Sequence, residues 1–299
     1  MIRLGVDIGG TKTHAVALDG ESRILAEHVL ETGQGAAQVV AAAEAAVRAV
    51  AAAVDREPDA ALTLGVGVPG SVDPVTGRVT HAVNLGVEEL RLGEDLARRL
   101  GRSVVVENDV KAAALGAYHL GGRRGSMAYL NLGTGLAAGL VLDGLLWRGA
   151  AGLAGEIGHV PVDPAGRSCP CGQRGCLETV ASGSGLARRW PAGVAPGVAA
   201  LFGAADDGDG QAAALRDELV AGVAAAVRLL VLTTGVDVVV LGGGVSSLGD
   251  RLRDAVAGQL DRWAAGSPFL ASAGLADRVE LAPDRAVLGA LGAALVPVL

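Results

Sequence analysis

All three cysteines of the chain lie within the eight residues CPCGQRGC, at positions 169–176. Three thiols cannot all pair within one chain, so a disulfide-stabilised domain is not expected. Tetrahedral zinc takes four ligands, and an imidazole stands just upstream at the end of the segment GEIGH. The sequence therefore predicts a structural zinc site formed by His159, Cys169, Cys171 and Cys176.

Carboxylates flank this loop and also follow a predicted strand. Glu156 in GEIGH and Glu178 in GCLE stand beside glycines, where they could accept hydrogen bonds from the hydroxyls of a sugar or remain solvated surface charges. Asp109 follows the predicted strand 103–107, and such strand ends face the crevice where open α/β sheets bind ligands. Asp109 is therefore a candidate general base, with Asn108 orienting the acceptor, although it could also cap the following helix.

Two short glycine turns could hold phosphates through their backbone N–H groups. Each leads from one predicted strand into another, whereas a Walker A loop leads into a helix, so that motif is not expected. An ordinary hairpin turn is the alternative for each, but their matching positions favour a polyphosphate held from both sides of a cleft. The residues of the two turns are Gly9, Gly10, Thr11, Gly133, Thr134 and Gly135.

A third glycine run, Gly242–Gly244 in VVVLGGGVSS, ends a predicted strand and enters a predicted helix. A helix N-terminus at such a place can receive a nucleotide. The G-x-G-x-x-G fingerprint is not met because Ser247 stands in place of the last glycine. The alternative is that Ser246 serves only as the N-cap of the helix.

The elements that carry these residues form two similar halves. The strands RLGVDIG, THAVALD and SRILAEHVLE open the first half, and SMAYLNLG, LAAGLVLDG and LLWRG open the second. Helices alternating with buried strands follow in each half, which is typical of α/β architecture. We predict two duplicated α/β domains that face each other across a cleft. The smaller comprises residues 1–108 plus about 284–299, and the larger comprises 109–283 with a zinc loop at 159–176.

Composition limits the classes of partner. The net charge is −7 and no long basic run occurs, which argues against nucleic acid. The N-terminus lacks the pattern of a signal peptide. The most apolar stretch, 222–245, is interrupted by Arg228, Asp237 and several glycines, so we expect a buried helix and strand there, not a membrane span. A cytoplasmic protein with reduced thiols is the simplest interpretation.

The motifs DIGGTKT, GVGVPGSVD, NLG, END, LGTG, GEIGH, CPCGQRGCLE and VVVLGGG, in this order, resemble the ROK family of sugar kinases and repressors over nearly the whole chain. The resemblance implies the duplicated actin-like (ribonuclease H-like) fold. It also implies an ATP-dependent hexose kinase of the glucokinase type, which converts glucose to glucose 6-phosphate. The implied cofactors are ATP and Mg²⁺ beside structural Zn²⁺, and the implied assembly is a homodimer or higher homo-oligomer.

The same resemblance assigns roles to individual residues. Asp109 is the catalytic base, Asp7 lies near Mg²⁺, and Gly243 and Gly244 lie near the adenosine. The residues implied to hold the sugar are Asn84, Asn108, Asp109, Glu156, His159 and Glu178. Those implied to surround the phosphates are Gly9, Gly10, Thr11, Lys12, Thr134 and Gly135, with Gly133 in the same turn.

The chain departs from the family pattern at several positions. Ala137 and Ala138 replace common glycines after the second turn, Val87 stands near a tryptophan of many glucose kinases, and Val110 and Lys111 replace small or polar residues.

Three other functions are considered. An N-acetylhexosamine kinase, acting on N-acetylmannosamine or N-acetylglucosamine, is the main competitor. A non-catalytic sugar-binding regulator would be expected to lose the base or the phosphate turns, and both are present here. A ROK repressor carries a DNA-binding module before the first glycine turn, where only six residues precede Asp7.

Overall fold

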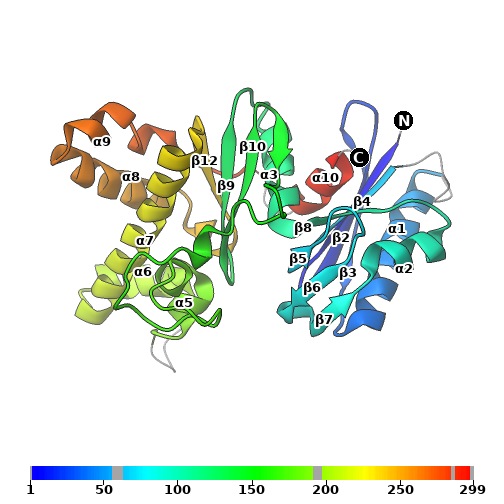
Figure 1. Ribbon diagram of the computed structural model, residues 1–299, viewed down its shortest axis with the longest axis horizontal. Coiled ribbons are helices and arrows are strands. Elements are labelled where there is room, and N and C mark those ends of the chain that lie inside the picture. The colour runs from blue at the N-terminus through cyan, green and yellow to red at the C-terminus, as the bar shows by residue number, and fades with distance from the viewer. Residues whose placement is uncertain (1, 56–62, 191–196, 284–286, 297–299) are drawn as a thin grey trace. The chain divides into compact units, whose positions relative to one another are not determined.

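The structure is a computed structural model, and it describes residues 2–55, 63–190, 197–283 and 287–296. The chain divides into two compact units (Figure 1). The first comprises Met1–Arg123, Leu146–Ala154 and Asp284–Leu299, and the second comprises Arg124–Leu145 and Gly155–Pro283.

The first unit is built on a five-stranded sheet of order β3-β2-β1-β4-β8. Strands β1 and β2 form the expected antiparallel hairpin, with Ile8 opposite Thr13. Strands β1, β4 and β8 are mutually parallel, so their carboxyl ends meet at one edge of the sheet. The strands are β1 (Arg3–Ile8), β2 (Lys12–Leu18), β3 (Ile24–Glu31), β4 (Thr63–Val68) and β8 (Val105–Asn108).

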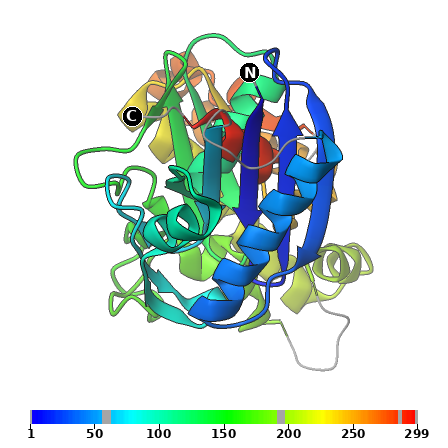
Figure 2. The same cartoon turned by 90° about the vertical axis from the view of Figure 1, so that its right-hand side faces the viewer.

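Helices cover both faces of this sheet. Ala15 and Ala17 of β2 belong to the core shared with α1 (Ala36–Ala53), which lies across the sheet in Figure 2. Val16 and Leu18 pack instead with α10 (Leu288–Leu295). Because alternate residues of a strand point to opposite faces, α1 and α10 lie on opposite sides of the sheet.

By length and apolar composition, α1 is the one described helix that could cross a membrane. A core helix of a globular protein passes the same test. Val39, Ala43 and Val47 are fully buried and share a core cluster with Leu4 and Val6 of β1. The structure therefore gives α1 the role of a core helix.

Helix α3 (Asp109–Leu120) groups with the first unit, although the sequence analysis began the second domain at residue 109. Its partner is α10, and glycines let the two helices touch. A Cβ atom on Gly116 would lie 2.1 Å from the Leu288 carbonyl oxygen, and one on Gly292 would lie 1.7 Å from that of Ala112. This close approach joins distant parts of the sequence.

A small antiparallel sheet of order β5-β6-β7 completes the described strands of the first unit. The 3₁₀ turn η1 between β6 and β7 carries Asn84, and α2 follows the sheet. The elements are β5 (Ser71–Val72), β6 (Val79–Ala82), η1 (Val83–Leu85), β7 (Val87–Leu90) and α2 (Leu92–Leu100).

The second unit repeats the first in its strand order, β11-β10-β9-β12-β13. In both sheets three antiparallel strands are followed by two parallel ones, which confirms the expected duplicated α/β architecture. The strands are β9 (Met127–Leu132), β10 (Leu136–Leu142), β11 (Leu145–Trp147), β12 (Val238–Gly242) and β13 (Val279–Leu281).

The described helices of the second unit include α7, whose second half is the helix expected in the apolar stretch 222–245. The helices are α4 (Glu178–Ala181), α5 (Gly183–Ala187), α6 (Val198–Asp206), α7 (Gly210–Thr234), α8 (Asp250–Ala265) and α9 (Pro268–Ala273), and the 3₁₀ turns are η2 (Ile157–His159), η3 (Gly244–Leu248) and η4 (Ala276–Arg278).

The helix expected directly after the third glycine run begins later than predicted. Residues Gly244–Leu248 form a 3₁₀ turn, in which the Ser246 hydroxyl donates to the Gly243 carbonyl oxygen at 2.8 Å. Ser246 is therefore not the N-cap of α8. Gly249, with φ +63°, separates the two segments and stands at that cap position.

Candidate active site and metal centre

Two carboxylates of the first unit lie at the carboxyl ends of β1 and β8, the strands on either side of β4. Asp7 on β1 pairs in register with Gly67 on β4. A Cβ atom on Gly67 would lie 3.5 Å from the Asp7 carboxylate and 3.6 Å from the Cα atom of Asp109, so this glycine leaves room between them. Gly289 of α10 approaches Asp7 more closely, since its Cβ atom would lie 2.3 Å from Asp7 Oδ2. Burial, and secondarily the charge of Asp109, raise the pKa of Asp7 to about 7.

Asn108 caps helix α3, and Asp109 is its first residue. The side-chain oxygen of Asn108 accepts from the backbone N–H groups of Val110 at 3.0 Å and Lys111 at 3.2 Å. Its amide nitrogen donates to the Gly70 carbonyl oxygen at 3.1 Å. Asn108 is therefore the N-cap of α3, and the alternative that Asp109 caps this helix is wrong. Instead the Asp109 carboxylate lies in the first helical turn, where the helix dipole favours negative charge.

A short polar segment joins the first glycine turn to the Asn84 turn. The hydroxyl of Thr32 donates to the Gly9 carbonyl oxygen at 2.8 Å and lies 2.9 Å from the buried hydroxyl of Thr13. Gln34 donates to the carbonyl oxygens of Gly10 at 3.3 Å and Asn84 at 3.2 Å. Thr32 and Gln34 could not be predicted from the sequence, because TGQG between a strand and a helix has the composition of any loop.

In the second unit, the two glycines of the segment GEIGH, Gly155 and Gly158, let its backbone approach strand β10 closely. A Cβ atom on Gly155 would lie 1.8 Å from the Ala138 carbonyl oxygen, and one on Gly158 would lie 2.0 Å from that of Leu136. The segment thus lies directly on the backbone of β10, which places Glu156 beside the start of that strand. Gly155 also has φ +93°, which favours glycine.

Glu178 is tied to the second glycine turn. Its Oε2 atom accepts from the Leu136 backbone N–H at 3.0 Å, and a Cβ atom on Gly135 would lie only 2.7 Å from that oxygen. The backbone N–H groups of Gly183 and Ser184 donate to the carbonyl oxygens of the turn at 2.9 and 3.0 Å. The carboxylate expected to hold a sugar therefore also fixes the turn expected to hold a phosphate.

The third glycine run approaches the same end of the sheet. Strands β9 and β12 are parallel, with Asn131 opposite Gly242. A Cβ atom on Gly243 would lie 2.7 Å from the Asn131 side-chain oxygen and 2.6 Å from the Leu132 carbonyl carbon. Ala137 and Ala138, which depart from the family pattern, lie within β10 and not in the turn that precedes it.

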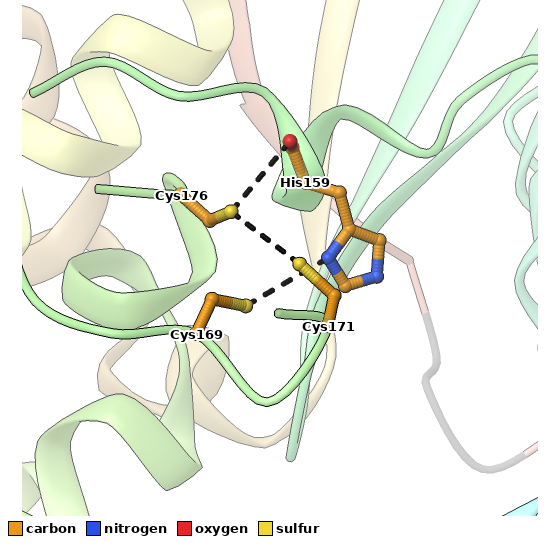
Figure 3. Close-up of side chains that lie close together, drawn as sticks. All are labelled: His159, Cys169, Cys171 and Cys176. Carbon is orange, nitrogen blue, oxygen red and sulfur yellow. Dashed lines mark hydrogen bonds between the residues drawn. The ribbon is translucent and has the colours of Figure 1, made fainter. Parts of the chain in front are cut away.

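The predicted zinc ligands converge (Figure 3). The four ligand atoms lie within 4.8 Å of one another, with 3.7 Å between the sulfurs of Cys171 and Cys176 and 4.0 Å between Cys169 Sγ and His159 Nδ1. Sulfurs bound to one tetrahedral zinc at about 2.3 Å would lie about 3.8 Å apart. The donor set and its spacing therefore fit a structural zinc ion.

The metal loop is held by its own backbone. Cys176 pairs with Pro161, and Gly175 approaches Asp163 so closely that a Cβ atom would lie 1.6 Å from the Asp163 carbonyl oxygen. The Gln173 amide donates to the His159 carbonyl oxygen at 3.1 Å. Hydrogen bonds from Gln173 lower the pKa of the Cys171 thiol, whereas burial raises that of Cys176.

The sugar-binding residues predicted by resemblance are divided between the units. Asn84, Asn108 and Asp109 belong to the first, and Glu156, His159 and Glu178 belong to the second. Within the second unit, His159 contributes to the metal cluster, while Glu156 and Glu178 lie along the first residues of β10.

The chain is similar in sequence and in fold to known sugar kinases. The glucokinase of Halalkalibacterium halodurans is 34% identical over 271 residues, which cover 83% of this chain and 82% of the relative. The ROK hexokinase of Thermus thermophilus superposes with a TM-score of 0.85 at 33% identity, covering 99% of this chain and 97% of the other. A ROK glucokinase from Streptomyces griseus, crystallised with glucose and AMPPNP, gives 0.79 at 32% identity and covers 99% of both chains. The ROK family model matches residues 3–297, and the chain therefore belongs to the ROK family.

Proposed function

We propose that this protein is an ATP-dependent hexose kinase of the glucokinase type, which phosphorylates the 6-hydroxyl group of glucose. The observation that carries the proposal is that Asp7 and Asp109 lie close together at the ends of β1 and β8, on either side of Gly67 of β4. Asp7 also lies next to the first glycine turn, residues 9–11. The chain is 32% identical to a glucokinase crystallised with glucose and AMPPNP. Carboxylates in that place can serve a phosphoryl transfer from nucleotide to alcohol.

Asp109 is the proposed general base. It accepts the proton of the sugar hydroxyl as that oxygen forms a bond to the γ-phosphorus of ATP. The bond from the γ-phosphorus to the β-phosphate oxygen breaks, and ADP leaves with the electron pair. The base contributes about 10²–10⁴-fold to the rate. Positioning of the reactants and neutralisation of charge supply most of the remainder.

Asp7 is the proposed contact to Mg²⁺. Its carboxylate is buried close to a second negative charge, which is a costly arrangement unless a cation compensates it. A hard oxygen donor of this kind suits Mg²⁺. When bound, the ion would neutralise charge on the phosphates of ATP.

The proposed zinc ion is structural. Four protein ligands leave no position for a reactive water molecule. The ring of His159 turns Nδ1 toward Cys169, so its other nitrogen is proposed to contact the sugar. Reduced thiols are needed for such a site, which fits a cytoplasmic enzyme. A homodimer is expected from the family resemblance, and light scattering after size-exclusion chromatography would measure the assembly.

The test of this function is ADP release with a panel of sugars. The panel contains glucose, mannose, fructose, allose, N-acetylglucosamine and N-acetylmannosamine. We expect the highest kcat/KM with glucose. A higher kcat/KM with an N-acetylated sugar would show that the protein is an N-acetylhexosamine kinase and not a glucokinase. Absence of sugar-dependent ADP release would refute the proposal.

A further inference from the structure

One buried ion pair of the first unit is used by none of the steps above. Arg148 Nε lies 2.5 Å from Glu107 Oε2, and the two side chains are only 16% and 4% exposed. The second carboxylate oxygen of Glu107 accepts the backbone N–H of Asn108 at 2.9 Å. The pair differs in this respect from surface pairs such as Arg78–Glu89, whose side chains are more than half exposed.

Glu107 stands at the strand end that carries the proposed base. It is the third residue of β8, directly before Asn108 and Asp109. It pairs with Gly67, which itself pairs with Asp7. Both carboxylate oxygens of Glu107 are therefore engaged at the point where β8 passes into α3, and a shift of Glu107 would move the base.

Arg148 opens residues 148–154, which we call the tether. The tether groups with the first unit, whereas Gly155–Pro283 belongs to the second unit. The next residue after Gly155 is Glu156, a proposed sugar contact. The anchor of the tether thus lies eight residues before that contact in the sequence.

The tether has little apolar packing of its own. Leu153 is 63% exposed, and Trp147 just before the tether is 53% exposed. Arg148 and Gly149–Gly152 line a hollow of about 380 Å³ together with Val72 and Arg78, so this part of the tether borders open space. A buried ion pair is therefore a principal attachment of the tether to the strand end of β8.

We propose that the Glu107–Arg148 ion pair is a positioning device for the kinase reaction. It holds the proposed base in register and fixes the tether from which the sugar-binding segment continues. The inference rests on the proposed function. Loss of the pair should impair turnover of the sugar more than binding of ATP, because Glu107 adjoins Asn108 and Asp109 and not the glycine turns.

The test must separate positioning from stability. Removing one partner of a buried ion pair leaves an uncompensated charge and destabilises the fold, whereas replacing both by neutral groups of similar size is often neutral. We therefore compare Arg148→Met and Glu107→Gln with the double variant. Arg78→Met is the matched control, since Arg78 lines the same hollow but forms an exposed pair.

The measurements are kcat and KM for glucose and for ATP, with a thermal melt of each variant. We expect the double variant to melt close to the wild type and to lose about 10²-fold in kcat/KM for glucose, as a misplacement of about 1 Å does. Its KM for ATP should change less than about threefold, because binding contacts to the nucleotide remain. Arg78→Met should match the wild type.

Two outcomes would overturn the inference alone, given an active wild-type enzyme. One is a double variant with wild-type kcat/KM for glucose, which would show that the pair serves stability only. The other is a KM for ATP that rises by as large a factor as kcat/KM for glucose falls. Wild-type protein that phosphorylates no sugar would overturn the proposed function, and this inference with it.

Discussion

Replacing Asp7 by asparagine should stabilise the fold while it removes activity. Burial, with the nearby charge of Asp109, raises the pKa of Asp7 from 3.8 to about 7. In the unfolded chain the carboxyl ionises near its ordinary value, so between these pH values the unfolded state loses its proton first. The free energy of unfolding therefore falls as pH rises from 3.8 to about 7, and the whole destabilisation is present above about pH 7.

The magnitude follows from the same values. The pKa of Asp7 rises from 3.8 to about 7, and each pKa unit corresponds to 1.36 kcal/mol. The ionised carboxylate therefore destabilises the folded state by about 4 kcal/mol. Asparagine keeps the shape of the side chain and carries no charge. In a chain of this size a stabilisation of 1 kcal/mol raises the melting temperature by about 2 °C, so a rise of several degrees is expected.

The assay is a thermal melt of both proteins at pH 8 and pH 5, without added magnesium. The difference in melting temperature should be larger at pH 8 than at pH 5. Asp73→Asn is the control, because the backbone N–H of Val75 lowers the pKa of Asp73 and no stabilisation is expected there. An Asp7→Asn variant that melts at or below the wild-type temperature at pH 8 would refute the reasoning.

Three further predictions test other parts of the site. Asp109→Asn should lower kcat by at least about 10²-fold while glucose binding persists, because an amide cannot accept the proton. Calorimetry with glucose checks the binding, and near-native turnover would show that Asp109 is not the base. Purified protein should contain one zinc per chain by elemental analysis, and Cys171→Ala should lose zinc and weaken glucose binding; a fully active, metal-free protein would contradict this. Thr32→Val should leave the hydroxyl of Thr13 and the carbonyl of Gly9 short of a partner, which costs about 1–3 kcal/mol and should raise KM for ATP. An unchanged KM for ATP would show that Thr32 does not support the turn.

The features that the sequence alone predicted depend on local chemistry. Three cysteines and a histidine predict a tetrahedral metal site from their ligand types alone, and in the structure their ligand atoms lie within 4.8 Å of one another. The hairpin of β1 and β2 follows from a turn too short for a crossover. Both could therefore be read from adjacent residues.

The features that the sequence alone missed depend on contacts between distant residues. Gly67, Gly289 and Gly292 resemble any glycine of a strand or helix until the structure shows which atoms they approach. Glu107 and Arg148 are 41 residues apart, and no local pattern joins them. The grouping of α3 with the first unit has the same origin, since α3 packs on a helix near the C-terminus.

Identification of the reaction product tests the central claim most directly. The protein is incubated with glucose, ATP and magnesium, and the products are identified by ³¹P nuclear magnetic resonance. We predict glucose 6-phosphate and ADP in equal amounts with the wild type, and neither in the same time with Asp109→Asn. ADP with free phosphate in place of a sugar phosphate, or a phosphate on another sugar oxygen, would contradict the account.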